Sequence, residues 1–260
     1  MLDMEQLIAV CRKAGAEIAP AARLSELTTF KIGGACEALV MLPDSGACQT
    51  VIQYLRDHEI SFALIGRGSN LLVPDQGYQG VILKLSGALA SDITEQNGIV
   101  TCGAGESLKN LCLFALEHSL TGLEFAYGIP GSVGGAVFMN AGAYDGEFSQ
   151  VLHSVTILDE TGAIRTLDAS ALNLGYRHSV FMEKPWIILQ ASVQLNSGEP
   201  DAIREKMQDL LGRRKAKQPL EYPSAGSTFK RPEGMFAGKL IMDAGLAGMQ
   251  IGGAAVSEKH

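Results

Sequence analysis

The chain has 260 residues, of which 47% are hydrophobic and 19% charged, so it has enough apolar surface for a folded core and intrinsic disorder is excluded. A net charge of −7 argues against a nucleic-acid-binding surface, and no apolar run reaches the ~18–20 residues of a membrane-spanning helix. The five cysteines form no CxxC pair and the N-terminus lacks a signal-peptide pattern, so no disulfide framework or zinc cluster is expected and we predict a cytoplasmic protein.

The first half of the chain predicts helices that alternate with short buried strands. Apolar residues at helical spacing predict an opening helix over 4–18, and a second helix, which Asp44 and Ser45 can cap, runs to about residue 59. A further helix is expected over 107–118. Short apolar runs bounded by turn residues predict buried strands over 38–43, 62–66, 80–85 and 98–105.

Less regular structure is expected next. Residues 121–143 are rich in glycine and lack periodicity, so they predict a loop with short helical turns. The elements that follow are a hairpin, a strand and an amphipathic helix, over 154–168, 186–195 and 200–217. Because the character of the sequence changes at NSGEP, we place a domain boundary near 198–200, between an α+β nucleotide-binding unit (1–198) and a second lobe (199–260).

Glycine accounts for 30 of the 260 residues, well above the roughly 7% of average proteins, and is concentrated in turns after apolar runs. IGRGSN (65–70) and GAGES (103–107) each follow a strand, where amides unobstructed by a Cβ atom suit a diphosphate; a plain tight turn is the alternative for each. Neither is a P-loop, and Leu71 excludes the GxGxxG fingerprint. YGIPGSVGGA (127–136) predicts a rigid loop that grips a flat heterocycle, or else a compact Ω-type loop.

Two polar segments in the second half are candidates for chemistry. Arg177 in YRHS is suited to stabilising a carboxylate or an enolate, because a guanidinium keeps its charge, although a single arginine also fits a surface position. Ser227 in SAGSTFKRP is a proton donor, a nucleophile or only a turn residue, and without a GxSxG elbow a hydrolase triad is not expected. The five histidines show no metal-ligand spacing, so no catalytic metal is predicted.

The order of the motifs carries more information than any one of them. Between Leu27 and His260 the motifs LTTFKIGG, IGRGSN, GAGES, LEFAYGIPGSVGGAVFMNAGA, YRHSVF, SAGSTFKRP and VSEKH follow one another, and in this order the chain resembles the UDP-N-acetylenolpyruvoylglucosamine reductase family. Members of this family are bacterial flavoenzymes of peptidoglycan precursor synthesis. The short spacing between YRHS and SAGSTF resembles the shorter of the family's two architectural types.

The resemblance implies an α+β fold. It comprises an FAD-binding domain of the PCMH, or vanillyl-alcohol-oxidase, type with two α+β subdomains divided near 87–98, and a C-terminal α+β substrate domain that is incomplete here. FAD is expected to bind non-covalently, since IGRGSN and GIPGSVGGA contain no histidine that would tether it. The residues expected to hold FAD are Ile65, Gly66, Arg67, Gly68, Ser69, Asn70, Gly103, Ala104, Gly105, Gly128, Ile129, Pro130, Gly131, Ser132, Gly134, Gly135 and Ala136.

The implied reaction reduces UDP-N-acetylglucosamine enolpyruvate to UDP-N-acetylmuramate in two half-reactions. NADPH first reduces the flavin, and flavin N5 then delivers a hydride to the enolpyruvyl double bond. The family uses an arginine on the substrate carboxylate and a serine as proton donor, which correspond to Arg177 and Ser227. Tyr176, Lys217 and Lys230 are expected to bind the substrate carboxylate or diphosphate. Neither nucleic acid nor a membrane is expected as a partner.

One part of the family pattern has no counterpart in this sequence. The family's chain continues for a few dozen residues beyond VSEKH and supplies a glutamate that joins the arginine and the serine. Glu258 does not match that position, so we expect either a truncated C-terminal domain or an enzyme whose second half-reaction is slowed. Two alternatives stay open: another FAD oxidoreductase of the same fold, or a nucleotide-binding module without catalysis.

Overall fold

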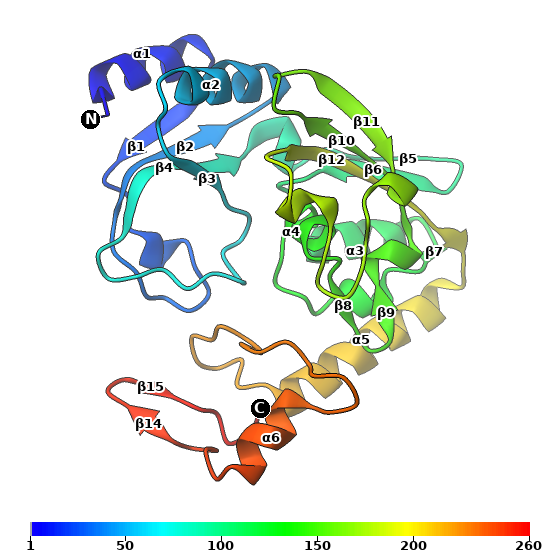
Figure 1. Cartoon of the computed structure of the whole chain (residues 1–260). Helices are drawn as coiled ribbons and strands as arrows, with labels where there is room; N and C mark the ends of the chain where they lie inside the picture. The colour runs from blue at the N-terminus through cyan, green and yellow to red at the C-terminus, as the bar shows by residue number, and fades with distance from the viewer. Residues whose placement is uncertain (1) are drawn as a thin grey trace.

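The computed structural model describes residues 2–260 and contains two neighbouring β-sheets with a C-terminal arm below them (Figure 1). The first sheet has the strand order β1-β2-β4-β3, in which β2 and β3 run parallel to β4. Its strands and the helices packed on it are β1 (Glu17–Pro20), β2 (Cys36–Leu42), β3 (Phe62–Leu64), β4 (Tyr78–Leu85), α1 (Met4–Lys13) and α2 (Ser45–Asp57). The opening helix is shorter than predicted, because Gly15, with φ +71°, turns the chain into β1.

The second sheet has five antiparallel strands in the order β11-β10-β12-β6-β5. These are β5 (Ile93–Gln96), β6 (Ile99–Gly103), β10 (Leu152–Leu158), β11 (Ile164–Asp168) and β12 (Ile187–Gln194), with helices α3 (Leu108–Glu117) and α4 (Val133–Phe138). The short elements are the 3₁₀ helices η1 (Leu24–Glu26), η2 (Gly87–Ala90), η3 (Glu124–Ala126), η4 (Phe148–Gln150), η5 (Ala169–Ala171) and η6 (Val180–Met182) and the strands β7 (Leu120–Thr121), β8 (Gly142–Ala143), β9 (Gly146–Glu147) and β13 (Asn196–Ser197).

Local sequence explains where helices α2 and α3 begin. The Asp44 carboxylate accepts a hydrogen bond of 2.8 Å from the backbone amide of Ala47 and starts α2. Ser107 starts α3 in the same way, with 3.1 Å between its Oγ and the amide of Asn110. Apolar side chains from both sheets then form one continuous core, so the two sheets are a single packed body.

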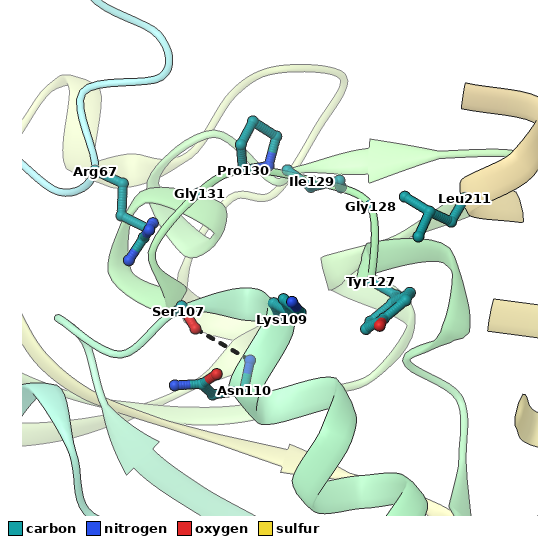
Figure 2. Close-up of a pocket in the computed structure, with 10 residues that line it drawn as sticks. All are labelled: Arg67, Ser107, Lys109, Asn110, Tyr127, Gly128, Ile129, Pro130, Gly131 and Leu211. Carbon is teal, nitrogen blue, oxygen red and sulfur yellow. Dashed lines mark hydrogen bonds between the residues drawn. The ribbon is translucent and has the colours of Figure 1, made fainter. Parts of the chain in front are cut away.

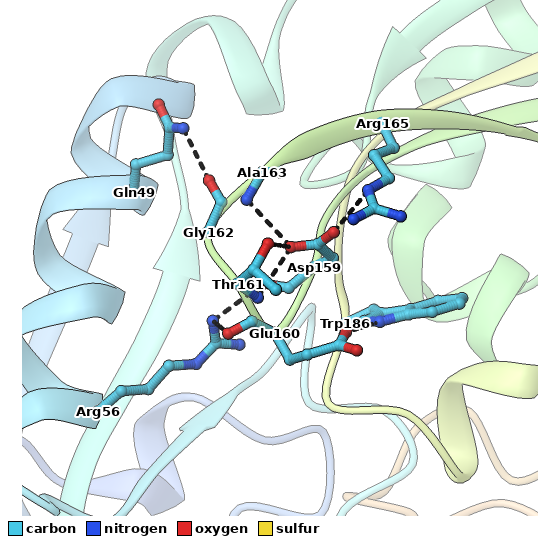
Figure 3. A network of polar contacts seen from close by, with 9 residues as sticks. All are labelled: Gln49, Arg56, Asp159, Glu160, Thr161, Gly162, Ala163, Arg165 and Trp186. Atoms are coloured by element: carbon cyan, nitrogen blue, oxygen red, sulfur yellow. Dashed lines mark hydrogen bonds and ion pairs between the residues drawn. The ribbon is translucent and has the colours of Figure 1, made fainter.

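A polar network ties α2 to the turn between β10 and β11 (Figure 3). The Arg56 guanidinium donates to the carbonyl oxygens of Asp159, Glu160 and Pro185 at 2.9, 3.1 and 3.0 Å. The indole N–H of Trp186 donates to the Glu160 carboxylate. These contacts join a helix of the first sheet to a turn of the second, at a place where the apolar core ends.

The Asp159 carboxylate stabilises that turn through hydrogen bonds within it. Its carboxylate accepts hydrogen bonds from the Thr161 hydroxyl and from the amides of Thr161 and Ala163, and it pairs with Arg165 at 2.6 Å. The Thr161 hydroxyl bond makes the largest contribution in lowering the pKa of Asp159 below its ordinary value. The charged carboxylate therefore holds the turn in the form that presents its carbonyl groups to Arg56.

The C-terminal arm begins with α5 (Pro200–Lys217), as predicted. Residues 218–236 form a loop, followed by α6 (Ala237–Asp243) and the small hairpin of β14 (Gln250–Ile251) and β15 (Ala254–Ala255). The sequence analysis did not predict α6 or this hairpin. No helix in residues 2–260 is long and apolar enough to cross a membrane.

Candidate cofactor and substrate site

Three glycine-rich segments, far apart in sequence, converge in the structure. Loop 65–70 follows β3 and meets 127–136 at Gly66, where an added Cβ atom would lie 2.2 Å from the Ser132 hydroxyl. Loop 103–107 follows β6 and pairs with 127–136 through backbone hydrogen bonds from Gly134 to Ala104 (2.7 Å) and from Val133 to Glu106 (2.8 Å). The absence of side chains at these glycines permits the close approach of the backbones.

Loop 65–70 presents a row of free main-chain donors. The amide of Ile65 still donates to Leu83, but the next five amides, of residues 66–70, donate to no backbone acceptor within residues 2–260. Gly68 has φ +65°, and a Cβ atom there would lie 2.0 Å from the carbonyl oxygen of Leu27. Consecutive amides without a backbone acceptor suit phosphate oxygens, the ligand that the sequence analysis predicts for this loop.

A cavity of about 430 Å³ opens beside this loop (Figure 2). Its walls come from loop 65–70, the start of α3, loop 127–131 and α5, and its lining residues are Arg67, Ser107, Lys109, Asn110, Tyr127, Gly128, Ile129, Pro130, Gly131 and Leu211. The described lining includes two cations and no carboxylate. Burial, and then the nearby charge of Arg67, lower the pKa of Lys84 on the neighbouring strand β4.

These features fit a dinucleotide cofactor such as FAD. The free amides and cations suit its diphosphate, and the backbone groups and apolar side chains of 127–131 suit a flat ring system. Most of the predicted FAD residues therefore lie on segments that come together around one region. Sequence analysis missed Lys109, Asn110 and Leu211 as lining residues, because neither glycine content nor a motif marks them.

Arg177 lies at the tip of a tight turn. Gly175 and His178 exchange two backbone hydrogen bonds of 3.1 Å, which leaves Tyr176 and Arg177 projecting from the tip. Arg177 adopts φ +53°, a conformation that favours glycine, so neighbouring contacts must hold it. Its guanidinium donates to the carbonyl oxygen of Gly142 at 2.8 Å.

Asn140, which the sequence analysis did not single out, fixes this arrangement. It is fully buried at φ +39°, its side-chain amide donates to the Gly175 carbonyl at 3.0 Å, and its side-chain oxygen accepts from the amide of Ser149 at 2.9 Å. Its own carbonyl oxygen lies 3.4 Å from the Arg177 guanidinium. Asparagine is among the residues that tolerate this backbone region, which is the sequence signal that would have identified it.

Ser227 lies on the exposed loop that follows α5. Its hydroxyl is 3.4 Å from Nε2 of His260. The same loop reaches the Arg177 turn through Tyr176, whose hydroxyl accepts a hydrogen bond of 3.3 Å from the amide of Arg231. Within residues 2–260 no hydrogen bond joins Arg177 directly to Ser227, so the structure links these two predicted residues through neighbouring positions.

The predicted lysines lie on the same arm. Lys217 is the last residue of α5 and Lys230 lies in the loop beyond Ser227; both side chains are exposed. Neither forms an ion pair with an acidic residue in the part of the chain that the structure describes. Both charges are therefore available to an anionic ligand.

Comparison with known proteins agrees with this geometry. Residues 35–168 match the model of an FAD binding domain, and residues 218–260 match that of the UDP-N-acetylenolpyruvoylglucosamine reductase C-terminal domain. Proteins named UDP-N-acetylenolpyruvoylglucosamine reductase from Clostridium perfringens and Clostridium beijerinckii are 49% and 51% identical over 237 and 239 residues, which cover 91% and 92% of this chain and 77% and 78% of theirs.

A solved structure gives the same result for the fold. The crystal structure of the reductase of this name from Thermus caldophilus superposes with a TM-score of 0.81 at 33% identity, covering 94% of this chain and 85% of that one. The predicted α+β fold with an FAD-binding domain is therefore confirmed.

Proposed function

The chain belongs to the UDP-N-acetylenolpyruvoylglucosamine reductase family, and from this we propose that it is a flavoenzyme that reduces UDP-N-acetylglucosamine enolpyruvate to UDP-N-acetylmuramate, with NADPH as the reductant. The observation that supports this most is the row of free amides at 66–70, beside a cavity whose described charged residues are all cations. That combination suits FAD, whose diphosphate needs such donors.

Bound FAD supplies hydride transfer, accepting a hydride from NADPH and then passing one to the terminal carbon of the enolpyruvyl double bond. Negative charge then develops on the carbon next to the substrate carboxylate. Arg177 opposes this charge with its guanidinium, which backbone carbonyls hold in place. Little reorganisation is needed at the moment of reaction, because the cation is already oriented.

Ser227 completes the reaction by giving its hydroxyl proton to that carbon. Serine is a weak acid in water, so it protonates carbon only if the acceptor is strongly basic and closely placed. Tyr176, Lys217 and Lys230 have the complementary task of holding the substrate. The two lysines are suited to its diphosphate, and Tyr176 lies next to Arg177, where the carboxylate would bind.

An anaerobic absorption experiment tests the proposal. Purified protein loaded with FAD should lose its flavin absorbance on addition of NADPH, and should recover it on addition of UDP-N-acetylglucosamine enolpyruvate. Loss of flavin absorbance on addition of a simple alcohol or sugar, in place of NADPH, would point to another flavin oxidoreductase. Failure to retain FAD at all would contradict the proposal at its first step.

A further inference from the structure

The loop that carries Ser227 lacks support from secondary structure. Residues 219–232, here called the donor loop, contain no helix or strand, and most of their side chains are exposed. A loop of this kind opens easily unless specific contacts hold it. Proton transfer to carbon, in contrast, requires that the donor be held within a fraction of an ångström. The contacts that anchor the donor loop therefore bear directly on the chemistry.

Two of the three hydrogen bonds that tie the donor loop to the first 200 described residues involve Thr29. The Thr29 hydroxyl donates to the Ser224 carbonyl oxygen at 3.1 Å, and the Ser224 amide donates to the Thr29 carbonyl oxygen at 3.3 Å. The third bond is the one from the Arg231 amide to Tyr176. Ser227 thus lies between two anchored points, at Ser224 and Arg231.

Thr29 also contacts the loop assigned to the cofactor. Its amide donates to the carbonyl oxygen of Gly68 at 3.2 Å, in the loop whose free amides suit a diphosphate. Ser224, the residue that Thr29 contacts, begins a short turn toward Ser227. In this turn the Ser224 hydroxyl accepts a hydrogen bond of 3.0 Å from the amide of Gly226. One half-buried residue therefore connects the diphosphate loop to the donor loop, across 195 residues of sequence.

We propose that Thr29 is a positioning residue that sets the place of the Ser227 hydroxyl relative to the cofactor. The preceding residue gives a contrast: the hydroxyl of Thr28 is buried and bonds to Ile32 within its own loop, so its role is local. The hydroxyl of Thr29 instead donates to a residue outside its own loop, Ser224 of the donor loop. The inference rests on the proposed function, since it takes Ser227 as the proton donor.

The test compares Thr29→Val, which exchanges the hydroxyl for a methyl group, with Thr29→Ser, which keeps the hydroxyl. Thr156→Val is the matched control, because the Thr156 hydroxyl lies on β10, outside the site, and within residues 2–260 its one hydrogen-bond partner is the hydroxyl of Thr166. Each holoenzyme is examined by hydrogen–deuterium exchange of residues 219–232 and by stopped-flow measurement of the two half-reactions. The second half-reaction is flavin reoxidation by the enolpyruvyl sugar.

Thr29→Val should increase exchange in the donor loop and slow flavin reoxidation by roughly threefold to tenfold, the effect of one net hydrogen bond, while reduction by NADPH stays within twofold. In Thr29→Ser, exchange in the donor loop and flavin reoxidation should both match the wild type, and Thr156→Val should change neither. Unchanged exchange, or increased exchange with unchanged reoxidation, would overturn the proposal. If the wild-type enzyme were not reoxidised by the sugar, the proposed function would fail, whereas the exchange data would still decide whether Thr29 anchors the loop.

Discussion

Ser227 is an exposed hydroxyl on a loop without regular structure, so its proposed role as proton donor makes a sharp kinetic prediction. Ser227→Ala should leave flavin reduction by NADPH within twofold of wild type, because that step needs no proton from the serine. Flavin reoxidation by the enolpyruvyl sugar should fall by about 10²–10⁴, the usual contribution of general acid catalysis. Stopped-flow absorbance measures both rates.

Ser170→Ala is the control for this change, since Ser170 is also exposed but lies in η5, on another part of the molecule. It should leave both half-reactions unaffected. If Ser227→Ala slowed both half-reactions equally, the serine would be supporting the fold or the cofactor, and the proton-donor assignment would be wrong.

Asn140 holds the turn that carries Arg177. In Asn140→Asp the side chain still accepts from Ser149 but no longer donates to the Gly175 carbonyl, which keeps only the His178 amide as a donor; the loss of one net hydrogen bond costs about 0.5–1.5 kcal/mol. We expect kcat for the sugar to fall about tenfold or more and the melting temperature to drop, as measured by steady-state kinetics and thermal unfolding.

The loss of kcat in Asn140→Asp should depend on the presence of Arg177. In an Arg177→Ala background, Asn140→Asp should cause little further loss of kcat, because residues that act as one unit are not additive. Asn97→Asp is the matched control: Asn97 also has a positive φ (+55°), but it lies in the β5–β6 turn, away from the site. An additive double variant would show that Asn140 acts on the reaction by another route.

At the scale of secondary-structure elements, the contact between α2 and the β10–β11 turn adds polar bonds to the apolar core that joins the two sheets. Arg56→Ala removes three hydrogen bonds from one guanidinium and should lower the free energy of unfolding by about 1–3 kcal/mol, as measured by urea denaturation. Arg204→Ala is the control, because its pair with Asp201 is exposed and worth at most about 1 kcal/mol. Equal effects of the two changes would mean that the network does not stabilise the junction.

The elements that the sequence predicted well have local signals. Asp44 caps α2 as expected, α3 lies within the predicted range 107–118 with Ser107 as its cap, and α5 has its predicted bounds because a proline opens it and charge marks its end. The strand β5 was missed because its sequence, ITEQ, is polar and mostly exposed; pairing with β6 across a turn makes it a strand. A strand that depends on pairing with another strand is hard to predict from its own segment of sequence.

At the scale of the whole molecule, the site is assembled from loops of both sheets and from the C-terminal arm. Sequence motifs identified the glycine loops as separate candidates, because amides without Cβ atoms have a recognisable composition. They did not show that Gly66 would face Ser132, or that Thr29 would bond to Ser224, since these contacts depend on the packing of the sheets and the arm. The convergence of the loops is a property of the fold, whereas the chemistry of each loop is a property of its sequence.

This assembly predicts that the cofactor stabilises the whole molecule and that one glycine controls the effect. Saturating FAD, at about 100 times its Kd, should stabilise the folded protein by about 2.7 kcal/mol, seen as a higher melting temperature. In Gly68→Ala the new Cβ atom would lie 2.0 Å from the Leu27 carbonyl oxygen, at a φ of +65° that disfavours alanine, so loop 65–70 must shift.

We therefore expect Gly68→Ala to bind FAD at least about tenfold more weakly, since a shift in loop 65–70 displaces the amides that face the diphosphate. Most of the FAD-dependent rise in melting temperature should then disappear. Gly212→Ala is the matched control, because Gly212 lies within α5 with no atom near its added Cβ; it should raise stability by about 0.5–1 kcal/mol and leave the FAD effect intact. Wild-type FAD affinity in Gly68→Ala would show that loop 65–70 does not hold the cofactor.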